Sequence, residues 1–430
     1  MIGGGTFTSQ NKKLPGAYIN FASAKNSSSG YGERGIAALA LDLNWGEDGK
    51  IIEITAKNFV KNALKVFGYE YSDDNLKGIR DLFKNTEKAF LYRLNSGNKA
   101  SCTYGQAKCS GTRGNDLKIV IAVNVDDNTK FDVSTYLGTK EVDSQTVSSA
   151  AGLVDNDFIV FTKTATLAVT AGTALTGGTN ANATGTTYQN FLDLLESYQF
   201  NALGCLSTEA SIINMYIAYT KRLRDTLGIK FQTVVYNTAA DYEGVVNVKN
   251  TTTESNTGLI YWVTGAIAGC EINKSNTNKV YDGEFTINTN YTQEQLKTSI
   301  DDGEFILHKV GDEVRVLVDN NSLTTVTEEK NEVFKLNQTI RVIDQIAIDI
   351  ATTFNTTYIG KVPNNESGRI SLWNDITTLF REYQKSQAIE NFEDSDVSVE
   401  AGENKKSVLV DVAVEIVGAM EKLYMTVVVE

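Results

Sequence analysis

The chain of 430 residues is poor in histidine, proline and cysteine, and these shortages exclude several classes of function. His308 is the single histidine, so metal sites built from several histidines are excluded and histidine-based acid–base catalysis is disfavoured. Only two prolines occur, and four cysteines are too few for a disulfide scaffold. Cys102 and Cys109 could face each other across a hairpin, but two reduced thiols near a loop are the favoured interpretation.

An excess of positive charge and a long apolar run are also missing. Lys plus Arg total 40 and Asp plus Glu total 53, so the formal net charge is −13. An acidic chain repels phosphate backbones, so no direct contact with nucleic acid is expected. The longest apolar stretch, Gly258 to Cys270, is too short to span a bilayer, so no membrane insertion is expected. Residues 1–20 show no signal-peptide pattern, which predicts a cytoplasm-like compartment or exit without secretion.

No motif that carries catalytic chemistry stands out. Gly46–Lys50 comes nearest to a phosphate-binding loop, but its spacing is wrong and a tight turn is the better interpretation. Gly111–Asp116 could form an anion-binding nest, yet a turn that opens the next strand is favoured. The carboxylate pairs Asp301–Asp302 and Glu328–Glu329 are interpreted as solvated surface. We therefore expect no catalytic residue, no metal and no cofactor, and predict that the protein is not an enzyme.

What is present is an ordinary globular composition, 41% hydrophobic and 22% charged, in a length that corresponds to about three domains. We predict a multidomain α+β and α/β protein. It has an α/β domain with helices on a mixed sheet, an inserted all-β sandwich-like module, and a C-terminal α+β domain with extended terminal arms. The predicted divisions are an N-terminal arm at 1–22, the first part of the middle domain at 23–97, the β module at 98–185, the α/β domain at 186–328, the C-terminal domain at 329–421 and the C-terminal arm at 422–430.

Periodic patterns predict individual elements. Helices are expected at Phe59–Phe67, Leu76–Phe83 and Phe191–Tyr198, from a cap at Ser207 or Thr208 to Leu223, and at Ile340–Phe354 and Ile370–Tyr383. Strands are expected at Ala89–Leu94, Leu117–Val125, Asp157–Lys163, Phe200–Leu206, Ile229–Tyr236, Glu304–Val310, Glu313–Val318, Val408–Ile416 and Lys422–Val429. The apolar face of the first C-terminal helix is formed by Ile340, Ile343, Ile346, Ala347, Ile350, Ala351 and Phe354.

Both chain ends read as strands, which is the most distinctive feature of the sequence. Gly16–Phe21 lies between two flexible segments, and an isolated strand cannot stabilise itself. Lys422–Val429 is apolar and strongly β-prone, so an unpaired edge there would invite other chains. Such strands add to the edge of another sheet by main-chain hydrogen bonds. The pattern favours a chain-linked assembly over an enzyme.

Motifs along the whole chain resemble those of contractile-tail sheath proteins from bacteriophages and from prophages of Gram-positive bacteria. The order of these motifs, together with the two arm-like ends, carries the resemblance. The matching segments are Gly4–Lys12, Pro15–Phe21, Leu43–Gly46, Ser110–Asp116, Tyr358–Asn364, Gly368–Arg369, Ala388–Phe392 and Met420–Val427.

The resemblance implies a structural subunit of the virion, assembled in the host cytoplasm. Its partners would be further copies of itself in six-fold rings stacked as a helix, the tail tube protein, and the baseplate and tail terminator proteins. On a trigger the sheath would shorten without hydrolysing nucleotide and drive the tube through the target envelope for DNA delivery. The sheath of a headless, phage-tail-like bacteriocin, with the same mechanics and no DNA, is the alternative.

The resemblance also assigns strands donated to neighbouring subunits. The N-terminal set is Gly16, Ala17, Tyr18, Ile19, Asn20 and Phe21, and the C-terminal set is Lys422, Leu423, Tyr424, Met425, Thr426, Val427, Val428 and Val429. The region near the C-terminus would face the tube. Within it, Arg381, Glu382 and Lys385 lie away from the apolar side of their predicted helix and are the predicted tube-facing residues.

Three other interpretations stay open from the sequence. The C-terminal strand could pair within the chain, with Val408–Ile416, instead of being donated. The helix–strand alternation after Tyr188 could belong to a nucleotide-dependent enzyme, but no glycine-rich phosphate loop follows its first strand. The Asn- and Thr-rich β module could belong to a surface-layer or adhesin protein, which would need an export signal.

Overall fold

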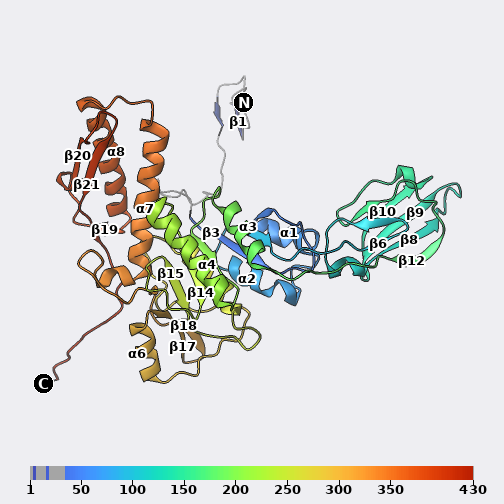
Figure 1. Cartoon of the computed structure of the whole chain (residues 1–430), viewed down its shortest axis with the longest axis horizontal. Helices are drawn as coiled ribbons and strands as arrows, with labels where there is room; N and C mark the ends of the chain where they lie inside the picture. The colour runs from blue at the N-terminus through green and yellow to red at the C-terminus, as the bar shows by residue number, and fades with distance from the viewer. Residues whose placement is uncertain (1–2, 6–15, 19–33, 430) are drawn as a thin grey trace.

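The protein is described here by a computed structural model that covers residues 3–5, 16–18 and 34–429. Figure 1 shows an elongated molecule with the β module at one end, the C-terminal domain (orange to red) at the other, and the α/β domain between them. The predicted fold class is therefore confirmed. The chain leaves the body at its C-terminus as a single extended segment.

The α/β domain is built on a seven-stranded sheet with the order β16-β15-β14-β13-β3-β5-β4. Its neighbouring strands are parallel except for β4, which runs antiparallel to β5. Because β3 pairs with both β5 and β13, segments before and after the β module build one sheet. The strands are β3 (Ile36–Leu41), β4 (Ile51–Thr55), β5 (Lys88–Arg93), β13 (Ala202–Gly204), β14 (Gln232–Tyr236), β15 (Val245–Val248) and β16 (Glu304–Phe305).

Helices cover both faces of this sheet, as the predicted helix–strand alternation requires. Successive side chains of a strand point to opposite faces, so Ala37 and Leu39 pack into one apolar cluster while Ala38 and Ala40 pack into the other. The first cluster is covered by α1 (Ala56–Phe67), α2 (Lys77–Phe83) and α5 (Gly258–Gly269), and the second by α3 (Gly185–Leu195) and α4 (Ala210–Lys221). A further helix, α6 (Gln293–Asp301), lies beside β16.

The start of α4 differs from the prediction. Its N-cap is Glu209 rather than Ser207 or Thr208, and the Ser207 hydroxyl accepts a hydrogen bond from the Glu209 N–H at 3.1 Å. Ser207 therefore forms a local turn before the helix instead of capping it. Beyond Lys221 the helix continues as one π-helical turn, Arg222–Thr226.

The β module consists of two small sheets packed on a shared apolar core, which agrees with the predicted sandwich. The four-stranded sheet has the order β10-β9-β8-β12, and the three-stranded sheet has the order β11-β7-β6. The 3-10 turn Thr112–Asp116 opens β8, as expected for Gly111–Asp116. The strands are β6 (Ser101–Cys102), β7 (Gly105–Ala107), β8 (Leu117–Val123), β9 (Phe131–Leu137), β10 (Lys140–Val147), β11 (Ile159–Phe161) and β12 (Thr170–Ala174).

A buried arginine joins the β module to the α/β domain. Arg93, at the end of β5, donates to the carbonyl oxygens of Gly46 at 3.0 Å and Ser110 at 2.9 Å, and lies 3.2 Å from the Asp48 carboxylate. Trp45, from the same loop as Gly46, is fully buried in the core of the module. The module is thus held at its stem by both polar and apolar contacts.

The strand predicted at Glu304–Val310 is split in two. Its first part, β16, joins the large sheet, and its second part, β17 (Leu307–Val310), forms a hairpin with β18 (Glu313–Val316). Gly311 in the connecting turn has a φ of +60°, a conformation that favours glycine. The predicted hairpin is confirmed, with both strands shorter than expected.

The C-terminal domain packs two long helices against two short antiparallel pairs of strands. Both predicted helices are present, the first with a π-helical end at Phe354–Tyr358. The strand predicted at Val408–Ile416 is interrupted and contributes to both pairs, β20–β21 and β19–β22. The elements are α7 (Asn337–Thr353), α8 (Glu366–Lys385), β19 (Ile389–Glu390), β20 (Val397–Ala401), β21 (Val408–Val412) and β22 (Glu415–Ile416).

The most apolar helix, α5, belongs to the core of the α/β domain. Within the described ranges no helix is long and apolar enough to cross a membrane. Gly265 and Gly269 allow α5 to approach the end of α2 closely, because a Cβ atom at Gly265 would lie 2.4 Å from the Leu82 carbonyl oxygen.

We expect Gly265→Ala to lower the free energy of unfolding by about 1–3 kcal/mol, since the added methyl group forces α2 and α5 apart. Gly185→Ala is the matched control. A Cβ atom at Gly185, the first residue of α3, would meet nothing within 4 Å. The free energy of unfolding of this variant should therefore equal that of the parent or exceed it by about 0.5 kcal/mol. Denaturant unfolding of the three proteins checks the expectation, and equal stability of both variants would contradict it.

Candidate functional site

The described ranges contain no cluster with the character of a catalytic or metal centre. No group of three or more His, Cys, Asp or Glu residues in them could hold a metal ion. His308 lies half-buried on β17, and burial lowers its pKa. Cys102 and Cys109 are both free thiols. The features that stand out are surfaces, and the first of them is the C-terminal arm, residues 422–429.

The C-terminal arm is extended and exposed along its whole length. Six of its eight side chains are large and hydrophobic, and the least exposed of these, Val427, is 69% exposed. Isolated surface hydrophobic residues are normal, but a continuous apolar run marks a binding surface. Figure 1 shows this segment pointing away from all three domains. The six residues are Leu423, Tyr424, Met425, Val427, Val428 and Val429.

The strand predicted at Lys422–Val429 is not formed within the single chain. The possible intrachain partner pairs with other strands on one side, Val408–Val412 with β20 and Glu415–Ile416 with β19, and the arm does not add to its other side. An extended segment without a neighbouring strand has no partner for its backbone N–H and C=O groups except water.

The two strand pairs of the C-terminal domain also have free edges. Within the part of the chain that the structure describes, β20 and β21 pair only with each other, and so do β19 and β22. A two-stranded sheet is marginal alone and exposes unpaired backbone groups on both sides. Leu409 on β21 is 52% exposed, which adds an apolar side chain to this surface.

The N-terminal arm is described only in part. Gly16, Ala17 and Tyr18 form β2, which pairs in parallel with β1 (Gly3–Gly5). The remaining predicted residues, Ile19, Asn20 and Phe21, lie outside the described residues.

The C-terminal arm leaves the body at a well-defined base, residues 417–421. The Val417 N–H donates to the Ala388 carbonyl at 3.1 Å, which continues the pairing of β22 with β19. The Gln338 side chain then holds the next residues with two hydrogen bonds, donating to the Val417 carbonyl at 3.1 Å and accepting from the Ala419 N–H at 3.1 Å. Finally, the Thr277 hydroxyl donates to the Glu421 carboxylate at 2.6 Å.

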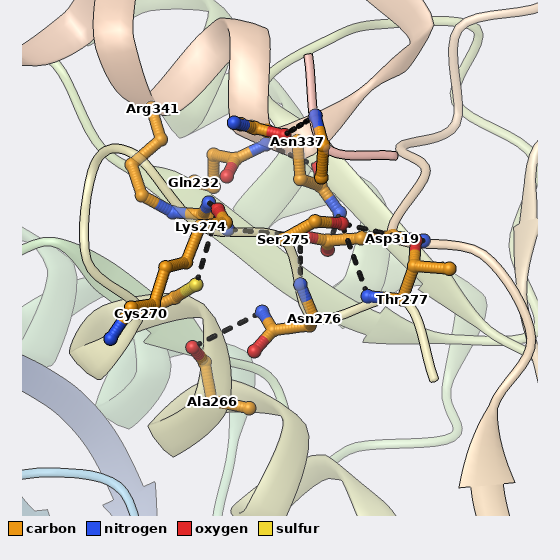
Figure 2. Close-up of polar contacts among 12 residues, drawn as sticks. Gln232, Ala266, Cys270, Lys274, Ser275, Asn276, Thr277, Asp319, Asn337 and Arg341 are labelled. Carbon is orange, nitrogen blue, oxygen red and sulfur yellow. Dashed lines mark hydrogen bonds and ion pairs between the residues drawn. The ribbon is translucent and has the colours of Figure 1, made fainter. Parts of the chain in front are cut away.

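Behind this base lies a buried polar network centred on Asp319 (Figure 2). The Asp319 carboxylate accepts hydrogen bonds from Arg341 at 3.1 Å, from the Asn337 side chain at 2.9 Å and from the Asn276 N–H at 2.9 Å. Its own N–H donates to the Thr277 hydroxyl at 2.9 Å. The base of the arm is therefore connected through Thr277 to a buried ion pair.

The buried face of α7 is polar, which corrects the predicted apolar face. Asn337, Arg341, Gln345 and Asp349 recur every four residues and are all buried. Of the predicted face, Ile340 is buried, Ile343, Ile346, Ala347, Ile350 and Phe354 are only partly buried, and Ala351 is exposed. The reason is that α7 lies between two domains. Asn337, Arg341 and Gln345 contact groups of the α/β domain, and Asp349 accepts a hydrogen bond from Tyr383 of α8. The predicted apolar residues Ile346, Ile350 and Phe354 pack in the core of the C-terminal domain.

A second buried ion pair strengthens this junction. Arg224 lies 2.5 Å and 2.9 Å from the two carboxylate oxygens of Asp344 on α7. Burial alone would lower the pKa of Arg224, but the Asp344 carboxylate outweighs burial and raises it. Nearby, burial and the positive charge of Arg341 lower the pKa of Arg34 to about 10. The Arg34 guanidinium donates to the Gln345 side chain at 3.3 Å.

Sequence reasoning missed Gln338, Thr277 and this network. The usable signal was the four-residue repeat of polar side chains along α7, which a search for apolar periodicity passes over. Thr277 had no such signal, since it lies in the loop between α5 and α6 and meets Glu421 only in the folded chain.

The predicted tube-facing residues lie together near the end of α8. Arg381, Glu382 and Lys385 are exposed, whereas the neighbouring Phe380 and Tyr383 are buried. Arg381 forms an ion pair with Asp394 in its own domain. Part of the positive charge predicted for this surface is therefore neutralised within the chain.

Family models of phage tail sheath proteins cover the chain from residue 34 to its end. The tail sheath protein Gp18 domain III N-terminal region matches residues 34–94, and the sheath β-sandwich domain matches 95–180. The phage tail sheath central domain matches 181–322, and the sheath C-terminal domain matches 329–430.

Individual relatives agree with these models. The phage-like element PBSX protein XkdK of Bacillus subtilis is 32% identical over 99% of both chains. The crystal structure of a sheath tail protein from Desulfitobacterium hafniense is 36% identical, with a TM-score of 0.84, over 95% of this chain and 99% of that one. The helical sheath of the anti-feeding prophage in its contracted state shares the fold at 13% identity, with a TM-score of 0.56 over 97% of this chain and 99% of that one.

We expect Asp319→Asn to lower the free energy of unfolding by about 3 kcal/mol or more, because it leaves the Arg341 charge buried without a counter-charge. Asp394→Asn removes the exposed partner of Arg381 by the same chemical change and should cost about 0–1 kcal/mol. Denaturant unfolding at neutral pH compares the two. Similar losses in both variants would show that the buried pair does not hold the junction.

Proposed function

Because the chain belongs to the phage tail sheath protein family, we propose that it is the structural subunit of a contractile tail sheath. In this proposal, subunits polymerise as six-fold rings stacked helically around a tail tube. The sheath then shortens and drives the tube through the target cell envelope for DNA delivery. The tube protein, the baseplate and the tail terminator are its partners in the virion.

One observation carries the proposal: the chain exposes both a free apolar strand and free sheet edges, and it does not pair them with each other. When a strand is added to a sheet edge by β-augmentation, the unpaired backbone groups of the strand and of the edge hydrogen-bond to each other. Since the two surfaces belong to one chain but stay apart, the proposal pairs the arm of one copy with a sheet edge of another.

The sequence of the arm suits a strand that is buried on both faces. Leu423, Met425, Val427 and Val429 alternate with Tyr424, Thr426 and Val428, so each face of the strand carries apolar side chains. Such a strand belongs inside a covered sheet. Its main chain would add roughly five hydrogen bonds, each worth about 1 kcal/mol net, besides the burial of its side chains.

A contact between an arm and a different surface of the next copy is heterologous. Repeating such a contact generates a ring where the rotation closes and a helix where it does not. A sheath of stacked rings uses both possibilities. The arm also works as a flexible link, because its hydrogen bonds to a neighbour persist while the domains move. Contraction therefore needs no hydrolysis, provided that the extended sheath is metastable when it is assembled.

Truncation after Glu421 should give a folded monomer that does not polymerise. The removed residues make no sheet contact within the chain, so its melting temperature should match that of the full chain. Electron microscopy for tubes and thermal unfolding of the same samples test this expectation. Tubes formed by the truncated protein, or a large drop in melting temperature, would contradict strand donation.

The proposed tube-facing surface gives a separate test. Reversing both charges with Arg381→Glu and Lys385→Glu should impair assembly on the tail tube and leave the monomer folded, because both side chains are exposed on α8. Asp394→Asn serves as the control, since it breaks the same ion pair without reversing the charge of the helix. A normal yield of sheathed tails from the double variant would remove these residues from the tube interface.

A further inference from the structure

We propose that Gln338 and Thr277 form a latch that fixes the direction in which the C-terminal arm leaves the subunit. This inference rests on the proposed function, in that it assigns a role to the base of the donated strand. It concerns residues 417–421 and not the arm itself, residues 422–429.

The side-chain amide of Gln338 makes the two hydrogen bonds that the backbone of a neighbouring strand would make. In an extended chain, the carbonyl of one residue and the N–H of the second residue after it point to the same side. The Gln338 amide meets this pair at Val417 and Ala419, donating to one and accepting from the other, each at 3.1 Å. Gln338 is itself 5% exposed, so α7 holds its side chain in place. The pairing that begins between β22 and β19 is thus extended by a side chain beyond the last residue of the sheet.

Thr277 makes the last contact before the arm becomes free. Its hydroxyl donates to the Glu421 carboxylate and accepts from the Asp319 N–H, so the outer end of the base is tied to the buried network of Figure 2. Every residue from Gly418 to Val429 is exposed, so the latch holds a segment that lies on the surface. Its outermost contact, at Glu421, directly precedes the arm.

The base needs such a latch because it contains a point of free rotation. Gly418 lies between the two residues that Gln338 holds, and a Cβ atom at Gly418 would meet nothing within 4 Å. A pocket of about 260 Å³ also lies beside the base, between Gly418 and Ala419 on one side and Ser275 and Leu336 on the other. Without the latch, the base would be free to turn into this space, and fewer arms would point towards a neighbour. The apparent affinity of a binding step falls with the fraction of molecules in the competent conformation.

The test uses Gln338→Met, which keeps an unbranched side chain and similar helix propensity but removes both hydrogen bonds. Gln293→Met, at an exposed position on α6, is the matched control. In the monomer, hydrogen exchange at the Ala419 amide should become at least about tenfold faster in Gln338→Met and stay unchanged in the control. The concentration needed for polymerisation should rise about three- to tenfold, with the melting temperature unchanged.

A second variant keeps the proposal testable if the first variant does not fold. Glu421→Ala removes the other contact of the latch at an exposed position, so it should fold normally and raise the polymerisation concentration in the same direction. Exchange at Ala419 that matches the parent in Gln338→Met would overturn the latch. So would faster exchange together with parental polymerisation in both variants. If truncation after Glu421 blocks polymerisation while the latch variants do not, the latch alone fails. If the truncated chain still polymerises, strand donation fails as well.

Discussion

The arrangement of the C-terminal domain on the α/β domain depends on the ion pair between Arg341 of α7 and Asp319 of the α/β domain. Both side chains are 1% exposed, and each charge would be strongly destabilising without the other. The Asp319 carboxylate also accepts hydrogen bonds from the Asn337 side chain and the Asn276 N–H, and Arg341 also donates to the Lys274 carbonyl, so the pair is bound by neighbours from several loops and helices. Because moving either domain would separate these buried charges, the pair favours the observed orientation of the C-terminal domain on the sheet.

Buried arginines connect the domains at both domain junctions, that of the β module and that of the C-terminal domain with the α/β domain. Arg93 joins the β module to the α/β domain by donating to two backbone carbonyls and pairing with Asp48. Arg341 and Arg224 join the C-terminal domain to the α/β domain by pairing with carboxylates. A guanidinium offers five N–H donors in a fixed plane, so one side chain can bind groups from several segments at once. Such contacts resist relative motion of the domains that they connect.

A body held together by buried contacts, with an exposed C-terminal arm, is suited to the proposed role of a sheath subunit. The domains keep their arrangement through buried polar contacts, while the apolar arm and the free edges of β20–β21 and β19–β22 offer pairing to other copies. Motion would then occur between copies, at the links, and not inside each copy. The base of the arm lies where these two parts meet, since Thr277 contacts Asp319 on one side and Glu421 on the other.

The sequence by itself determined the α/β domain, the β module, the two C-terminal helices and the β-prone ends, because local apolar periodicity and turn residues depend on neighbours along the chain. It misassigned the cap of α4, the continuity of the strand at Glu304–Val310 and the buried face of α7. Each error arose where contacts distant in sequence override a local pattern. Only the tertiary structure placed Gln338 against Val417 and Thr277 against Glu421, since these pairs are 79 and 144 residues apart. The sequence around a polar side chain does not predict such a distant hydrogen-bond partner, because the packing of the domains determines which groups meet.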